Sequence, residues 1–264
     1  MTRTELLHTE RDGAVQVIRM VNDRTRNSLN NEMRIELSAA LTRAADDDAV
    51  RAIYLTGSGK AFCSGGDLHN LKSLTGPWQV HRRFRNLGKW LLPLLHLDKP
   101  VVVGVNGVAV GGGMGLALTG DVLIAAESAK FMAGFFRLGI VPDVGMMYTL
   151  PRLIGLARAK NFLFSNGTWT AQEALELGLV AQVVADSDMD AVALARAHEI
   201  AEGPAQGMGL AKLLMARSFE SSLAEMFLLE DLGQSLAMSG EEFSEGLDAL
   251  LEKRSPDFTR GRKR

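Results

Sequence analysis

A glycine-rich stretch at residues 101–121 has the residue types that hold a negatively charged atom with backbone amides. An apolar run over 101–105 predicts a buried strand, and helical spacing begins at Met114 after three glycines at 111–113. A helix that begins directly after such a turn presents unpaired N–H groups and the positive end of its dipole. The stretch has no Lys or Arg and lacks the Gly-Lys-Ser/Thr ending of a phosphate-binding loop. It therefore favours a small transient anion, such as an enolate oxygen.

A second glycine turn and one carboxylate add to this chemistry. The turn lies at residues 61–68 (AFCSGGDL), after an expected strand over 51–56. Asp143 lies among apolar residues that include Phe135 and Met146, where partial burial would raise its pKa toward that of a general base. Asp143 also precedes an expected helix, and an N-cap role there would lower its pKa instead. The sequence leaves both interpretations open.

Alternating strands and helices must position these residues. Residues 14–56 read strand, helix, strand, with the spacing of a parallel unit. Further strands are expected at 101–105, 121–126, 130–132 and 180–184, and helices at 144–165 (interrupted at Pro151), 170–177, 190–201, 207–239 and 241–253. The predicted fold class is α/β, with an α/β core over 1–200 and a helical C-terminal region over 201–264.

Composition excludes several classes of protein. Apolar residues make up 47 % of the 264 residues, which is enough for a substantial core, and the net charge of −2 gives no basis for nucleic-acid binding. A single cysteine, Cys63, excludes an internal disulfide, and the five histidines lack metal-ligand spacing, so no metal site is expected. No apolar run is long enough to span a bilayer. A cytoplasmic protein without a membrane partner is expected.

Both glycine turns closely resemble those of the crotonase (enoyl-CoA hydratase/isomerase) superfamily. The resemblance continues through Asn-Ser-Leu-Asn at 27–30, Asp-Lys-Pro at 98–100, Pro-Asp at 142–143, Leu-Pro-Arg at 150–152 and Glu-Lys-Arg at 252–254. It implies a crotonase-type ββα spiral core with a helical C-terminal trimerisation region, in a homotrimer or a dimer of trimers. It also implies an acyl-CoA thioester substrate, with coenzyme A as part of that substrate and no separate cofactor.

The resemblance also assigns site residues. The backbone N–H groups of Gly66 and Gly112 would form an oxyanion hole for the thioester oxygen. The expected substrate-binding residues are Arg26, Ala61, Cys63, Gly65, Asp67, Leu68, Gly111, Phe135, Met146 and Lys253. Each of these assignments has a structural alternative: Asp67 could only cap a helix, and Cys63 could be a buried apolar residue. The basic residues Arg26, Lys253 and Arg254 could contact the coenzyme A phosphates or could be ordinary solvated charges.

The sequence departs from the hydratase pattern at its two catalytic glutamates, whose positions hold Gly115 and Phe135. Hydration needs a base that activates water and an acid that protonates the α-carbon, so it cannot run here in its usual form. Asp143 matches a position at which several isomerase branches of the family carry a catalytic aspartate. The resemblance therefore favours an enoyl-CoA double-bond isomerase that uses Asp143. The alternatives are a hydratase with a non-standard acid/base and a non-catalytic acyl-CoA binder.

Overall fold

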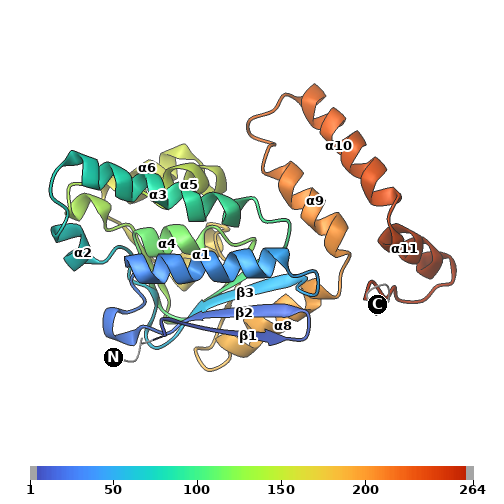
Figure 1. The fold of residues 1–264 in the computed structure, drawn as a ribbon, viewed down its shortest axis with the longest axis horizontal. Coiled ribbons are helices and arrows are strands. Elements are labelled where there is room, and N and C mark those ends of the chain that lie inside the picture. The colour runs from blue at the N-terminus through green and yellow to red at the C-terminus, as the bar shows by residue number, and fades with distance from the viewer. Residues whose placement is uncertain (1–4, 260–264) are drawn as a thin grey trace.

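The computed structural model describes residues 5–259. Three pairs of strands with the same arrangement follow one another along the chain (Figure 1). Each pair consists of a buried strand of five or six residues, a tight turn and a strand of three residues. Apolar and β-branched residues fill the longer strands, as expected for strands covered on both faces. The pairs are β3 (Ala52–Gly57) with β4 (Ala61–Cys63), β5 (Val101–Val105) with β6 (Val108–Val110), and β7 (Val122–Ala126) with β8 (Lys130–Met132).

Each pair contributes one strand to each of two sheets. The larger sheet has the order β1-β2-β3-β5-β7-β10 and the smaller one β4-β6-β8-β9. The strands of successive pairs run parallel in both sheets, and helices follow each pair. This repetition confirms the predicted ββα spiral. The remaining strands are β1 (Leu7–Asp12), β2 (Val15–Met20), β9 (Thr168–Thr170) and β10 (Gln182–Val184).

Helices surround the two sheets (Figure 1). The helix α8 packs on β3, β5 and β7, while α1 packs against α3 and the first hairpin. The helices are α1 (Asn31–Asp46), α2 (Leu68–Lys72), α3 (Pro77–Leu95), α4 (Gly112–Ala117), α5 (Met146–Ile154), α6 (Leu156–Phe164), α7 (Ala171–Glu176), α8 (Met189–Ala201), α9 (Ala205–Met215), α10 (Leu223–Met238) and α11 (Glu241–Leu251), with 3₁₀ turns η1 (Asp23–Thr25) and η2 (Phe135–Arg137). None of the helices within residues 5–259 has the length and apolar character needed to cross a membrane.

Two helix predictions are wrong in detail. The break expected at Pro151 falls instead at Gly155, whose φ of 82° cannot continue the helix, while α5 runs through the proline. The single helix expected over 207–239 is two helices. A turn over 216–222 separates them, and Ser222 starts α10 with a capping box in which its hydroxyl accepts from Glu225 N.

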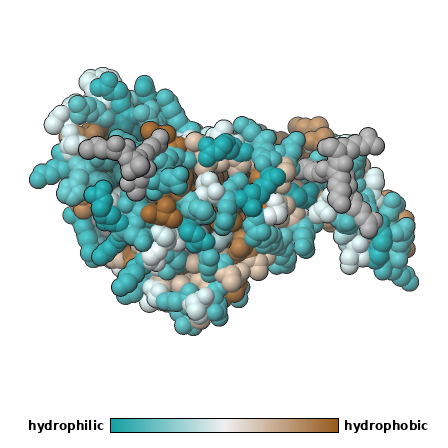
Figure 2. Space-filling model, turned by 60° about the horizontal axis from the view of Figure 1, so that its bottom comes forward, coloured by the Kyte–Doolittle hydropathy of each residue, from teal (hydrophilic) through white to brown (hydrophobic). Residues whose placement is uncertain are grey.

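The last two helices project from the body of the molecule (Figures 1 and 2). Helix α9 stays docked on the core through Lys212, whose Nζ lies 2.6 Å from the Asp121 carboxylate. Helix α10 packs on α9 and α11 and has no buried residue. The predicted boundary at residue 200, between the α/β core and the helical C-terminal region, stays a prediction. Helix α9, which follows it, contacts both the core and α10. Residues 1–4 and 260–264 of the two predicted regions lie outside the described residues.

Candidate active site

The two predicted glycine turns are in contact. They follow β4 and β6, which are neighbours in the smaller sheet. A methyl group added to Gly65 would lie 2.5 Å from Val110 O and 3.4 Å from Gly112 N. Gly65 also has a φ of 84°, so both its conformation and its contacts require glycine.

Hydrogen bonds from the preceding segment hold the first turn in place. The Leu29 N–H donates to Gly65 O at 2.8 Å. Asn27 is fully buried with a φ of 57°, and its side-chain amide donates to Ala61 O at 2.9 Å. Asn is among the few residues that adopt this left-handed conformation readily. Hydrogen bonds from the segment 27–30 thus fix the backbone of the turn that contains Gly66.

Several backbone amides in these turns have no partner among the described residues, and those of Gly66 and Gly112 are two of them. The N–H groups of Gly66 and Gly112 donate no hydrogen bond to any of residues 5–259. Gly112 is the first residue of α4, where an amide has no acceptor in its own helix. Unpaired amides in touching turns are the geometry that could hold a developing oxyanion.

A cavity of about 280 Å³ opens beside these amides. Both glycine turns line it, together with α1, α2, α3, η2 and the loop before α5. The surface is mostly apolar, which suits a hydrocarbon chain. The apolar lining residues are Leu29, Leu68, Leu71, Phe84, Leu87, Val110, Met132, Phe135, Leu138, Ile140 and Val144.

Asp143 is the one residue with a carboxyl group among the described residues that line the cavity. A methyl group added to Gly112 would lie 3.3 Å from Asp143 Oδ1, so the carboxylate is next to that amide. Burial raises the pKa of Asp143, and the nearby Arg83 and Arg34 lower it, leaving it above the usual value. The N-cap interpretation is wrong, because α5 is capped at Gly145 without any side-chain hydrogen bond.

Backbone occupies the position at which the hydratase pattern has its first glutamate. A methyl group added to Gly115 would lie 2.7 Å from Val144 O and 2.9 Å from Val144 Cβ. Val144 is buried and has a φ of 50°, a strained conformation for a β-branched residue. The loop that delivers Asp143 therefore fills the space of the missing glutamate. Phe135, at the second glutamate position, lines the cavity itself.

The cavity gathers about half of the residues predicted for the site. Those that line it are Gly65, Gly66, Leu68, Gly111, Gly112, Phe135 and Asp143. The acidic residues on either side of β7, Asp121 and Glu127, do not line the cavity with Asp143.

The other predicted residues do not line it. Ala61, Cys63 and Met146 are buried, and burial raises the pKa of the Cys63 thiol to about 12, as expected for an unreactive cysteine. The Asp67 carboxylate accepts from Asn70 N at 2.8 Å and caps α2. Arg26 is exposed at the end of η1.

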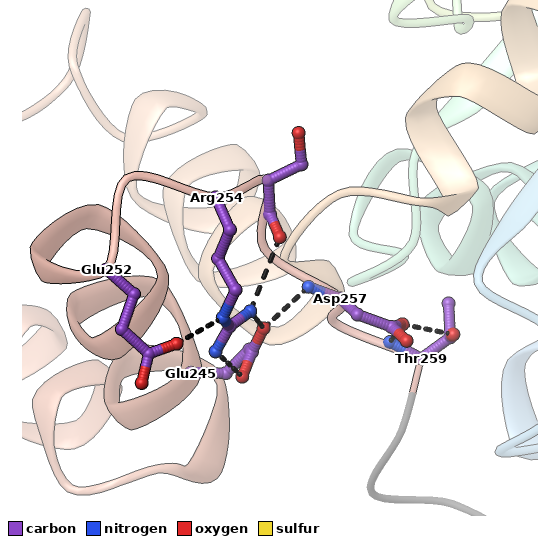
Figure 3. A network of polar contacts seen from close by, with 6 residues as sticks. Glu245, Glu252, Arg254, Asp257 and Thr259 are labelled. Atoms are coloured by element: carbon purple, nitrogen blue, oxygen red, sulfur yellow. Dashed lines mark hydrogen bonds and ion pairs between the residues drawn. The ribbon is translucent and has the colours of Figure 1, made fainter.

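The basic C-terminal residues are far from the cavity within one chain. Lys253 follows α11, at the opposite end of the molecule from α2 (Figure 1). The adjacent Arg254 donates to the carboxylates of Glu245 and Glu252, as Figure 3 shows. Its guanidinium is therefore engaged in holding the turn after α11.

Sequence reasoning missed three cationic residues of the cavity, which are Arg34 from α1, Arg83 from α3 and Arg137 from η2. Arg34 and Arg83 are half-buried, and Arg137 is exposed. Arg83 lies four residues before Leu87, so the two share a helix face, but this spacing alone does not predict that the face lines a cavity.

Comparison with known proteins agrees with this architecture. A model of the Enoyl-CoA hydratase/isomerase family matches residues 10–261. The 1,2-epoxyphenylacetyl-CoA isomerase of Escherichia coli (strain K12) is 39 % identical over 88 % of this chain and 90 % of its own length. A probable enoyl-CoA hydratase of Rhodobacter capsulatus is also 39 % identical, over 92 % of this chain and 93 % of its own. The crystal structure of an enoyl-CoA hydratase/isomerase from Cupriavidus metallidurans CH34 has a TM-score of 0.92 and 33 % identity, covering 98 % of both chains. This chain therefore belongs to the enoyl-CoA hydratase/isomerase family.

Proposed function

We propose that this protein is an enoyl-CoA double-bond isomerase in which Asp143 carries the proton. The observation that supports this role is the position of the Asp143 carboxylate beside the unpaired Gly112 amide, in a cavity whose described lining has no second carboxyl group. A raised pKa makes that carboxylate a stronger base than an exposed aspartate. The name of one relative, an isomerase of a CoA thioester, is in keeping with this reaction.

The proposed reaction needs one carboxyl group. The thioester oxygen of a 3-enoyl-CoA accepts hydrogen bonds from the Gly66 and Gly112 amides, and the Asp143 carboxylate removes a proton from C2. The electron pair of that C–H bond enters a dienolate, whose oxyanion each amide stabilises by about 3 kcal/mol. The neutral Asp143 carboxyl then returns the proton to C4, and the double bond moves to C2–C3. No water is consumed, and coenzyme A takes part only as a portion of the substrate.

The experiment is the substitution Asp143→Asn, assayed with 3-hexenoyl-CoA. Loss of a general base costs about 10²- to 10⁴-fold in rate, so isomerisation should fall by that amount. Glu127→Gln is the control, because it removes an exposed carboxylate that does not line the cavity. Equal rates for the parent and the Asp143 variant would refute the assignment.

Hydration is the second candidate function, because several relatives are named probable enoyl-CoA hydratases. Here Asp143 would have to serve water and the α-carbon in turn. Crotonyl-CoA in ¹⁸O-labelled water separates the two functions, since hydration places solvent oxygen in the product. A protein that binds the thioester and turns over neither substrate would be a non-catalytic acyl-CoA binder.

We also propose that the chain assembles as a trimer, or as a dimer of trimers, through its C-terminal helices. The support is the apolar surface of α10, on which six large side chains are each 49–74 % exposed: Leu223, Phe227, Leu228, Leu232, Leu236 and Met238. Exposed apolar surface on this scale is typical of a contact with another chain. Such an assembly would also let Lys253 meet the coenzyme A phosphates in another copy, since it cannot reach the cavity of its own.

A further inference from the structure

Two half-buried guanidinium groups line the acyl cavity, and the proposed isomerisation gives neither of them a contact with the substrate. Arg34 projects from α1 and Arg83 from α3, and both line the cavity in which Asp143 lies. Burial lowers the pKa of each arginine, and the Asp143 charge raises it, so both cations lie partly out of water and near that carboxylate. The rest of the wall around them is mostly apolar. Cations in such surroundings call for a counter-charge.

Carboxylates of the chain meet that demand only in part. Asp143 is the one carboxyl group among the described residues of the cavity wall, and Asp67 acts on Arg83 and Glu32 on Arg34 only through their charges. Arg83 donates no hydrogen bond to any of residues 5–259, although a guanidinium carries five donors. Arg34 is oriented by Asn30 O at 3.3 Å and by the Asn31 side chain, and both partners are uncharged.

Neutralising Asp143 does not account for this arrangement. Neither Arg34 nor Arg83 forms an ion pair or hydrogen bond with Asp143 among the described residues. Arginine binds carboxylates best in a paired, bidentate geometry, and the Arg83 fork remains free to do so. The excess positive charge therefore fits an anion that is brought in by the ligand.

We propose that the acyl group accepted by this cavity ends in a second carboxylate, so that the substrate is the CoA monothioester of an unsaturated dicarboxylic acid. Arg83 binds the distal carboxylate and Arg34 adds a second positive charge. The thioester oxygen lies at the Gly66 and Gly112 amides, so the two ends of the acyl group are held on either side of Asp143. This inference rests on the proposed function for its placement of the thioester, and it sets the specificity of the same site.

Binding of saturated thioesters tests the inference without any turnover. Titration calorimetry compares butanoyl-, hexanoyl- and octanoyl-CoA with the monothioesters of the matching dicarboxylic acids. We expect the carboxylated member to bind about 10-fold or more tightly at one chain length at least, because a hydrogen-bonded charge pair contributes that much. Arg83→Gln should remove most of the preference and Arg34→Gln part of it. Arg82→Gln, an exposed arginine on α3 that does not line the cavity, should preserve it.

Several outcomes would overturn the inference. The parent protein could bind the carboxylated and plain thioesters equally at all three lengths, a result that needs no variant to fold. Arg83→Gln could weaken both members of a pair by the same factor, which would assign the arginine to the electrostatics of Asp143 or to stability. A parent protein that shows the preference but isomerises neither 3-hexenoyl-CoA nor its carboxylated analogue would contradict the proposed reaction and leave the arginine site standing.

Discussion

Opposing effects at one residue set the chemistry of the site. Burial raises the pKa of Asp143, while Arg83 and Arg34 lower it. Burial alone would favour a neutral carboxyl group, which cannot act as a base. The two arginines favour the ionised form without contacting it, and this balance would give the proposed base a raised strength.

A pH dependence of the proposed isomerisation follows from this balance. The base must be ionised, so kcat/KM should rise with pH and reach half its maximum above pH ~4, the value of an ordinary aspartate. Arg83→Gln removes a charge that lowers the Asp143 pKa, so its profile should move to higher pH. Arg82→Gln is the matched control on the same helix. An unchanged or downward-shifted profile for Arg83→Gln, measured by initial rates from pH 4 to 9, would contradict this account.

The same pKa shift has a consequence for stability. A carboxyl group whose pKa is raised in the folded state contributes stability below its unfolded pKa and loses it as the pH rises through the folded value. Asp143→Asn removes this loss, because an amide does not ionise. We expect the variant to be more stable than the parent at pH 7, with the difference shrinking as the pH falls through the raised Asp143 pKa toward ~4. Urea unfolding at both values checks this, and a less stable variant at pH 7 would contradict it.

At the scale of elements, the loop before α5 decides which chemistry the fold can support. Its Val144 packs on Gly112 and Gly115 in a left-handed conformation, and this packing places Asp143 beside Gly112. The position that carries a glutamate in the hydratase pattern therefore has no room for a side chain. One loop conformation therefore has two effects: it leaves no space for a side chain at position 115, and it places the Asp143 carboxylate in the cavity.

Restoring the glutamate should therefore fail to restore hydration. Gly115→Ala introduces a Cβ 2.7 Å from Val144 O and should destabilise the fold by about 1–3 kcal/mol, with Gly115→Glu costing at least as much. Gly88→Ala in α3 is the control, because the nearest atom to its new Cβ lies 3.9 Å away and alanine favours helix by up to about 1 kcal/mol. Thermal unfolding and crotonyl-CoA hydration are the measurements. Active hydration by a stable Gly115→Glu variant would show that the loop gives way.

The sequence predicted elements where one local signal dominates. The buried strands follow from apolar and β-branched runs, and the glycine turns from a pair of glycines at 65–66 and three glycines at 111–113, and the structure has them as expected. The sequence predicted the helix break at Pro151, although it lies at Gly155, because both residue types disfavour the helix interior. The sequence alone does not show which of the two ends the helix. Arg83 was missed for another reason: the direction in which a long side chain points depends on the neighbouring helix, which one chain segment does not encode.

At the scale of the whole molecule, large apolar side chains are buried in the body but exposed on the last two helices. The sheets and the helices around them bury their large side chains, whereas α10 and α11 leave most of theirs exposed, with Leu250 at 76 %. Polar contacts hold the start of α11 against α9 and the body, since the Glu242 carboxylate accepts from Gln206 N at 3.0 Å and lies 3.7 Å from Arg51. The exposed face is therefore presented in a defined orientation, as a surface for assembly requires.

Leu232→Glu on α10 should break the proposed assembly. Leu232 is 59 % exposed in the single chain, so a charge there costs the isolated subunit little, whereas burial in a contact with another copy would cost several kcal/mol. We expect sedimentation velocity to give at least three times the subunit mass for the parent and a single subunit mass for the variant. Ile35→Glu is the control, because Ile35 is 65 % exposed on α1 in the body of the molecule. A parent that sediments as one subunit, or a Leu232 variant with the mass of the parent, would show that α10 does not join the copies.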